Sequence, residues 1–429
     1  MPTGPQRLRT WLGGALVVVA PFLVLGGCPG GEDGGGAGGT GGAAGDAAID
    51  VADGDGAEPW DPVWHETKPK DWPTVGPEKN PDCGPGCRVA LNVPISSAGD
   101  IPGHTSSRVM GLSSNGQGVA LSRVGESTTS LVPRKNGTGH IQLGIWGDYM
   151  SSARSFGIGD GQIELTSLLT GETKVVFRWQ PVDGSADGSE LTALNDKYVF
   201  YTFKGIHSRN RQTGEQKWLA FGSCYSMCAT ESLLVCENGK IYVLDPELPE
   251  MKGKKKLDDG KELQVDGSCS ADRKQYSWID YRDPPGPGSH VFSTRKGGEV
   301  YFHDFTTGKT RRATFDSPDK PRAKVYPGIG DGLVVWNEPP LGAADPNPEN
   351  WGSYYGGSTA LATLDLATGK RCQLPDVNFG STIAYKSVHG RHVYGRWFDK
   401  KTVKTYLVDI DLDYAGFKWQ CQDTPGWVQ

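Results

Sequence analysis

The chain has 429 residues, with 44 Lys and Arg against 50 Asp and Glu, and a formal net charge of −6 at pH 7. This acidic balance argues against a nucleic-acid partner, because phosphates attract basic surfaces. The 61 glycines and 29 prolines indicate a chain with many tight turns.

Residues 1–27 have the order of a secretory signal, with Arg7 and Arg9 ahead of an apolar run from Trp11 to Leu25. The run is too short to cross a bilayer as a helix, so we expect it to be cleaved. The sequence Leu-Gly-Gly-Cys that ends at Cys28 resembles the bacterial lipobox. The resemblance implies that Cys28 is acylated and becomes the mature N-terminus; the alternative is an unmodified thiol behind an ordinary signal.

The residue after Cys28 bears on the choice of membrane. In enteric bacteria an Asp at this place resembles an inner-membrane retention signal, whereas this chain has Pro29. The resemblance therefore implies an exported protein that is lipid-anchored at the outer membrane.

Two segments separate the signal from the remaining chain. Residues 28–58 consist mostly of Gly, Ala, Asp and Pro, a composition that does not bury enough apolar surface to fold. We expect them to form a disordered tether. Residues 59–83 are rich in Pro and Trp and are expected to lead into a folded domain at 84–429.

The cysteines agree with export. Eight remain after Cys28, an even number that predicts up to four disulfides in an oxidising compartment. We expect Cys372 to pair with Cys421, because both fall in the charged last strands of the two final repeats. Cys83 and Cys87 form the second expected pair. No pairing is assigned to the other four. The pairs Cys83/Cys87 and Cys224/Cys228 each have three residues between their cysteines and no His at zinc-ligand spacing, which argues against a structural zinc site.

An internal repeat predicts the architecture. Seven times, a polar turn such as Asn195-Asp196 precedes an apolar strand, and in most units a Thr-Gly turn such as Thr213-Gly214 follows. The spacing is about 46 residues, enough for four short strands and typical of propeller blades. The sequence thus predicts an all-β fold, a β-propeller of seven four-stranded blades; six or eight blades also fit. An extra strand within 84–106 is expected to pair with the last blade and close the ring.

Two families share these repeats. Asp304-Phe305-Thr306-Thr307-Gly308-Lys309 resembles a blade of TolB-type propellers, and residues 211–218 are similar to the repeat of PQQ-type propellers of the BamB-like kind. The resemblance implies the propeller fold. It implies no quinone cofactor, because the acidic and Asn cluster of a quinone and calcium site has no counterpart in this sequence.

Enlarged connections provide the candidate binding face. The connection between the second and third strands grows to 280–290 in the fifth unit and to 337–358 in the sixth, and the segment 180–189 joins two blades. In a propeller all three emerge on one face. The candidate binding residues there are Arg282, Asp283, Glu349, Trp351, Tyr354 and Tyr355. The alternative is that these loops only cover the mouth of the central channel.

Metal and catalytic signals are sparse. Asp183, Ser185 and Asp187 alternate as calcium ligands do, but position 194 is Leu where such a loop ends in Glu, so a plain Asp-Gly turn is the competing interpretation. The eight histidines are scattered and no hydrolase motif surrounds them. We therefore expect no catalytic residues and no cofactor.

The sequence favours a membrane-tethered scaffold that binds an envelope protein or glycan. The alternative is a hydrolase with its site at the channel mouth. Carboxylates gathered with His at that mouth would favour the hydrolase, whereas aromatic side chains and isolated charges would favour the scaffold.

Overall fold

Short runs of Val, Ile, Leu, Tyr and Trp between Gly, Asn and Asp turns form strands along the chain, as their β-propensity predicts. Every element of the computed structural model is a β-strand among the residues that it describes. None of these residues lies in a helix long and apolar enough to cross a membrane. The described residues are 60–98, 108–114, 118–133, 139–157, 160–179, 191–257, 264–281, 298–316, 322, 324–340, 360–374, 384–424 and 427.

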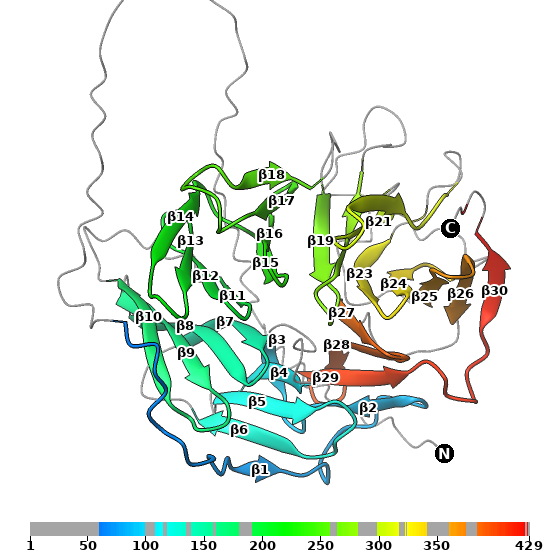
Figure 1. The fold of residues 1–429 in the computed structure, drawn as a ribbon. Coiled ribbons are helices and arrows are strands. Elements are labelled where there is room, and N and C mark those ends of the chain that lie inside the picture. Colours follow the sequence, from blue (N-terminus) through cyan, green and yellow to red (C-terminus); the bar gives the residue numbers. More distant parts are fainter. Residues whose placement is uncertain are drawn as a thin grey trace, which may run out of the picture. The chain divides into compact units, whose positions relative to one another are not determined.

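The strands form seven antiparallel sheets (Figure 1). Each sheet is one blade and contains four neighbouring strands, and two of the sheets have a fifth strand at one edge. The first three blades follow one another directly along the chain. Blade one contains β3 (Ile95–Ala98), β4 (Arg108–Ser113), β5 (Gly118–Arg123) and β6 (Thr129–Pro133), with β1 (Thr74–Val75) added at its outer edge. Blade two contains β7 (Gly139–Trp146), β8 (Tyr149–Gly157), β9 (Asp160–Ser167) and β10 (Thr173–Trp179). Blade three contains β11 (Thr192–Leu194), β12 (Tyr198–Thr202), β13 (Ile206–Asn210) and β14 (Gln216–Ala220).

The remaining blades repeat this plan, with two exceptions at the ends of the chain. Blade four contains β15 (Ser226–Ala229), β16 (Leu234–Glu237), β17 (Ile241–Leu244) and β18 (Lys254–Lys256); blade five contains β19 (Gln264–Cys269), β20 (Gln275–Asp280), β21 (Glu299–Asp304) and β22 (Lys309–Arg312); blade six contains β23 (Val325–Gly330), β24 (Leu333–Glu338), β25 (Ala360–Asp365), β26 (Lys370–Leu374) and β30 (Gln420–Asp423); blade seven contains β27 (Ala384–His389), β28 (His392–Asp399), β29 (Lys404–Asp411) and β2 (Cys87–Val89).

The apolar core lies between the blades. Seven clusters of buried side chains each join two consecutive blades, and one of them joins blade seven to blade one through Tyr394, Leu407, Val109 and Ala120. A single sheet cannot bury both of its faces, whereas stacked neighbours can. The protein is therefore a seven-bladed β-propeller, as the repeat predicts.

The ring closes through the strand expected near the start of the domain. β2 pairs with β29, matching Cys87 with Ile410 and Val89 with Val408, and becomes the outermost strand of blade seven. Arg88 of β2 donates from Nε and Nη2 to Asp409 Oδ2 at 2.9 and 2.6 Å. Asp409 is buried. The closing strand is thus held by a charge-assisted contact as well as by its backbone ladder.

Two details differ from the sequence prediction. The sequence prediction takes Asn115-Gly116 as the turn that opens the first unit, but the strands on either side of it, β4 and β5, are the second and third of blade one. The matching turns of the other blades connect the first and second strands. In addition, the chain leaves blade seven after β29, so the turn near Ala415 and Gly416 joins strands of two different blades, and β30 pairs with β26 of blade six.

The structure contains both disulfides expected from the sequence, Cys83 with Cys87 and Cys372 with Cys421. The second joins neighbouring strands of blade six, since Cys421 lies on β30 and not in the seventh blade. Four further cysteines pair as Cys224 with Cys236 and Cys228 with Cys269.

The Pro- and Trp-rich segment packs along the propeller, and we call residues 60–75 the strap. Trp60 Nε1 donates to Arg211 O at 3.0 Å, and Trp72 Nε1 donates to Leu168 O at 2.9 Å. Both acceptors lie at turns between third and fourth strands. The strap therefore runs from blade three past blade two to blade one, where β1 pairs with β6.

Candidate functional site

Antiparallel order assigns each connection to one of two faces. The crossover face carries the blade-to-blade connections and the turns between second and third strands. The hairpin face carries the turns between first and second strands and between third and fourth strands, so the strap lies there. The strands that flank the three enlarged connections end on the crossover face by this order.

The candidate residues in those connections lie outside the described residues. This applies to Arg282, Asp283, Glu349, Trp351, Tyr354 and Tyr355, to the calcium candidates Asp183, Ser185 and Asp187, and to Cys28. The described residues contain no group of three His, Cys, Asp or Glu side chains arranged to hold a metal. The contacts and distances on the crossover face therefore come from described side chains near the ends of the strands.

A row of aromatic rings lies at the crossover end of blades two and three, and we call it the aromatic rim. Adjacent ring centroids along the row are 4.6 to 6.2 Å apart. Cross-strand pairing produces the order, because Tyr201 of β12 stands opposite His207 of β13, which stands opposite Trp218 of β14. The members are Trp179, Phe177, Phe203, Tyr201, His207, Trp218 and Phe221.

The rim runs from the interior to solvent. Tyr201 is buried, whereas Phe221 in the connection from blade three to blade four is 64% exposed. Four residues further on, Tyr225 is 73% exposed. Gly205 permits the close packing at the second-to-third-strand turn, because a Cβ there would lie 2.4 Å from Trp218 Nε1. Exposed rings next to buried ones form a rigid apolar surface with little side-chain freedom to lose on binding.

His207 is the titratable member of the rim. Its Nε2 donates to Phe203 O at 2.9 Å, which leaves Nδ1 as the unprotonated nitrogen of the neutral ring. Burial lowers the pKa of His207 below its ordinary 6.5, although the bond to Phe203 and the charge of Glu250 act in the opposite direction. The ring is therefore neutral at pH 7 and stacks between Tyr201 and Trp218 without a charge.

This lowered pKa predicts a loss of stability in acid. As the pH falls through 6.5, the unfolded chain binds a proton that His207 in the folded protein does not, so the free energy of unfolding decreases. His207→Phe removes this contribution. Melting temperatures at pH 8 and pH 5.5 should therefore differ less for the variant than for the wild type. Equal differences for the two proteins would contradict the assignment.

Charged side chains gather on the crossover side of blades five and six. Lys324 is fully buried, and its Nζ lies 2.6 Å from Asp316 Oδ2 and 3.2 Å from Glu299 Oε2. Burial alone would raise the pKa of Asp316, but the charge and hydrogen bond of Lys324 and the Arg322 amide outweigh it, so the pKa is lowered. Arg371 pairs with Glu338 in the same network. These carboxylates already have cations against them, an arrangement typical of a structural network.

A histidine and a carboxylate also meet on blade seven. His392 Nδ1 lies 2.8 Å from Asp409 Oδ1, and Tyr394 OH donates to Oδ2 at 3.1 Å. Burial, together with the charge of Asp409, raises the pKa of Tyr394, so its hydroxyl stays protonated. Asp409 is also the partner of Arg88. The group fastens the closing strand, and it stands at the hairpin end of the blade, away from the enlarged connections.

Comparison with known proteins assigns no family and no function to the chain. No family model and no curated protein match the chain. Among solved structures, the tricorn protease aligns at 11% identity and a TM-score of 0.48 over 79% of this chain, which spans only 36% of that protein. TolB from Acinetobacter baumannii aligns at 14% identity and 0.35, over 65% of this chain and 63% of that one.

An oligogalacturonate lyase from Vibrio parahaemolyticus aligns at 10% identity and a TM-score of 0.46, over 82% of this chain and all of that one. At these identities and scores the likenesses carry no argument about activity. The propeller assignment rests on the chain's own sheet order and inter-blade clusters.

Proposed function

We propose that the chain is an exported, lipid-tethered scaffold whose crossover face binds a protein or glycan of the cell envelope. The observation that carries the proposal is the aromatic rim, which continues from buried Tyr201 to exposed Phe221. Aromatic side chains are enriched among the anchors of binding surfaces. Tyr225 extends the apolar surface along the same face.

Binding is favoured over hydrolysis by the state of the charged groups near that face. Lys324 lies between Asp316 and Glu299, and Arg371 engages Glu338. A general acid or base needs a side chain that reaches a substrate and exchanges a proton with it. Carboxylates held by buried cations do not fit that role, whereas a rim of rigid rings fits a recognition surface.

Removing the exposed rings tests the proposed surface. The double variant Phe221→Ala/Tyr225→Ala should weaken partner binding by at least about 30-fold, because one anchor contributes about 2 kcal/mol or more. Its melting temperature should stay close to that of the wild type, since exposed positions shift stability by less than about 0.5 kcal/mol. Quantitative pull-down from intact envelopes with the tether retained provides the measurement.

A matched control comes from the opposite face. Leu169 is 50% exposed at a hairpin-face turn, so Leu169→Ala removes a similar apolar group without touching the rim. It should leave partner recovery unchanged. Equal recovery of envelope components by the wild type and the double variant would reject the rim as the binding surface.

The anchor is tested separately. The eight described cysteines all form disulfides, which supports an oxidising compartment, and Cys28 follows the cleavable signal. Cys28→Ser should release the protein from washed membranes while its melting temperature stays the same, because one residue carries the lipid. A variant that remains in the washed membrane pellet would contradict the anchor.

A further inference from the structure

A cavity of about 220 Å³ lies between blades one and two. Its floor is apolar, formed by Val119 and Val132 of blade one and Met150 of blade two. The strap covers it on one side. The lining residues are Lys70, Trp72, Val119, Val132, Pro133, Met150, Ser152, Arg154, Glu164, Thr166, Gly171 and Thr173.

The strap brings an aromatic ring to this cavity. Trp72 is partly buried, and its indole is fixed by the hydrogen bond to Leu168 O. Gly171 has a φ of +77°, and a Cβ there would lie 3.0 Å from the Trp72 ring. The Thr-Gly turn of blade two thus provides the close approach that seats the ring. Lys70 Nζ lies 5.9 Å from the centre of the same ring.

The blade-two wall is polar where a propeller interface is usually apolar. Ser152 and Arg154 of β8 face the cavity together with Glu164 and Thr166 of β9, because alternate residues share one side of a strand. Arg154 Nη1 pairs with Glu164 Oε1 at 3.0 Å, and both side chains are 92% buried. Gln162 donates to the same carboxylate. A buried ion pair adds little stability over well-packed apolar residues, and this one places two charged groups in the wall of the cavity.

One hydroxyl in the wall has no partner. Ser152 is fully buried, and its Oγ makes no hydrogen bond within the structure. An unsatisfied buried hydroxyl costs about 1 to 3 kcal/mol, and most buried polar groups avoid that cost. Nearby, Thr166 Oγ1 and Thr173 Oγ1 lie 3.0 Å apart. Each of these hydroxyls can donate or accept a hydrogen bond.

We propose that this cavity is a binding site for one sugar unit in its pyranose form. The volume of 220 Å³ is smaller than the roughly 300 to 1,000 Å³ of pockets for drug-sized ligands, and suits a single ring. A pyranose presents an apolar face that can lie against Trp72 or the floor. Its hydroxyl groups both donate and accept, which matches Ser152, Thr173 and the Arg154–Glu164 pair. A hydrocarbon ligand would leave the Ser152 hydroxyl without a partner.

This site is separate from the aromatic rim. It lies between blades one and two, and rim residues do not line it. The inference therefore does not depend on the proposed partner of the crossover face, and each can fail without the other.

Ligand-observed saturation-transfer NMR on the full chain in detergent tests the site, with D-glucose, D-galactose, D-mannose and N-acetyl-D-glucosamine as separate probes. At least one probe should receive saturation from the wild type. Ser152→Leu fills the cavity and should weaken that probe's binding by at least about tenfold, the effect of one lost buried hydrogen bond. Trp72→Ala should weaken it as well.

Two further variants serve as controls. The first tests whether a loss of binding comes from misfolding, and the second tests whether the sugar binds at the aromatic rim instead of in the cavity. Thr173→Val removes a hydroxyl at nearly constant volume on the outer strand of blade two and should weaken the same probe. Its melting temperature should fall by no more than about 2 °C, because Thr166 loses one hydrogen-bond partner. Phe221→Ala/Tyr225→Ala should bind the probe as the wild type does. The proposal is overturned if none of the four sugars receives saturation, or if the binding probe loses nothing in Ser152→Leu, Trp72→Ala and Thr173→Val.

Discussion

Lys324→Met should lower the free energy of unfolding by about 3 to 5 kcal/mol, because it leaves Glu299 and Asp316 buried without their shared cation. Lys324 is fully buried between blades five and six and also donates to Gly298 O and Arg322 O. For a domain of this size the loss corresponds to roughly 4 to 7 °C in melting temperature. Differential scanning calorimetry measures the shift directly.

The matched control is Lys255→Met. Lys255 is exposed on β18, the outer strand of blade four, so its replacement should change stability by less than about 0.5 kcal/mol. The pH dependence provides a second readout. The lowered pKa of Asp316 contributes stability that is present above the unfolded value of 3.8 and is lost as the pH falls through the folded value. If Lys324→Met and the wild type have the same melting temperature at pH 7, the Lys324 network does not stabilise the interface between blades five and six.

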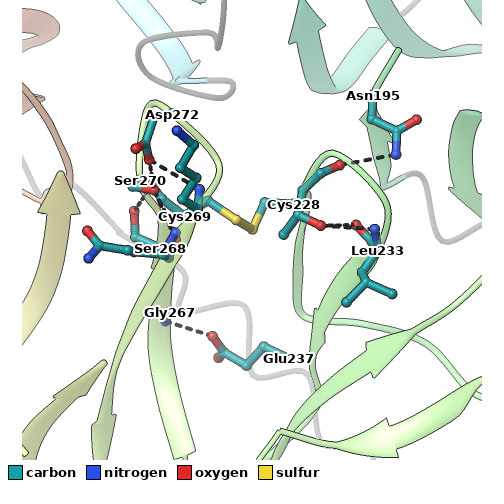
Figure 2. Close-up of a disulfide and its surroundings, with 12 residues drawn as sticks. Asn195, Cys228, Leu233, Glu237, Gly267, Ser268, Cys269, Ser270 and Asp272 are labelled. Atoms are coloured by element: carbon teal, nitrogen blue, oxygen red, sulfur yellow. Dashed lines mark hydrogen bonds between the residues drawn. A yellow bond between two sulfur atoms is a disulfide. The ribbon is translucent and has the colours of Figure 1, made fainter. Parts of the chain in front are cut away.

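The double variant Cys228→Ser/Cys269→Ser should lose about 4 kcal/mol, because this disulfide spans 41 residues and restricts the unfolded chain over that distance. Figure 2 shows the bridge between the ends of β15 and β19, the first strands of blades four and five. Besides this bridge, the Gly267 amide donates to Glu237 Oε2 at 2.8 Å across the same interface. The lost stability should appear as earlier thermal unfolding of the oxidised protein.

Cys83→Ser/Cys87→Ser is the control with the same chemistry. That disulfide spans only four residues, so the same chain-entropy relation gives a loss of about 2 kcal/mol. The two double variants should therefore rank by the length of chain that each bridge closes. Equal losses for the two would show that the inter-blade bridge does not act through the unfolded chain.

Local chemistry was sufficient to predict the repeat. Thr-Gly turns such as Thr170-Gly171 and Thr213-Gly214 require a residue at positive φ, and Gly171 and Gly214 adopt it in the structure. The most favoured blade number, seven, followed from that spacing, and the closing strand from the segment 84–106. The pair Cys372–Cys421 was predicted correctly although the spacing assigned Cys421 to the wrong blade. The first unit was placed one strand out of phase, because an Asn-Gly turn looks the same whichever pair of strands it joins.

The candidate site was less accessible to sequence reasoning. The aromatic rim depends on register, since Tyr201, His207 and Trp218 meet only because their three strands pair in that order. Phe177 joins them from the neighbouring blade. The cavity also depends on strand register. One feature of the sequence does point to it, because Ser152 and Arg154 occupy alternate positions of a strand on a side that is expected to be apolar.

The place of Cys421 shows where repeat counting fails. The last strand of a repeat was expected to remain with its own unit, yet β30 crosses back to β26 and β2 takes its place in blade seven. Edge strands have unpaired backbone groups that accept whichever segment reaches them. Sequence spacing does not identify that segment.

The strap braces three blades from outside their sheets. Trp60 is held at a turn of blade three by its bond to Arg211 O and by the Arg209 guanidinium, 4.8 Å from the ring centre, while Trp72 is bonded to Leu168 O of blade two and β1 pairs with β6 of blade one. The outer edges of these blades therefore separate only if these contacts break. Trp60→Ala would free the blade-three end of the brace and let that edge of the ring open more often.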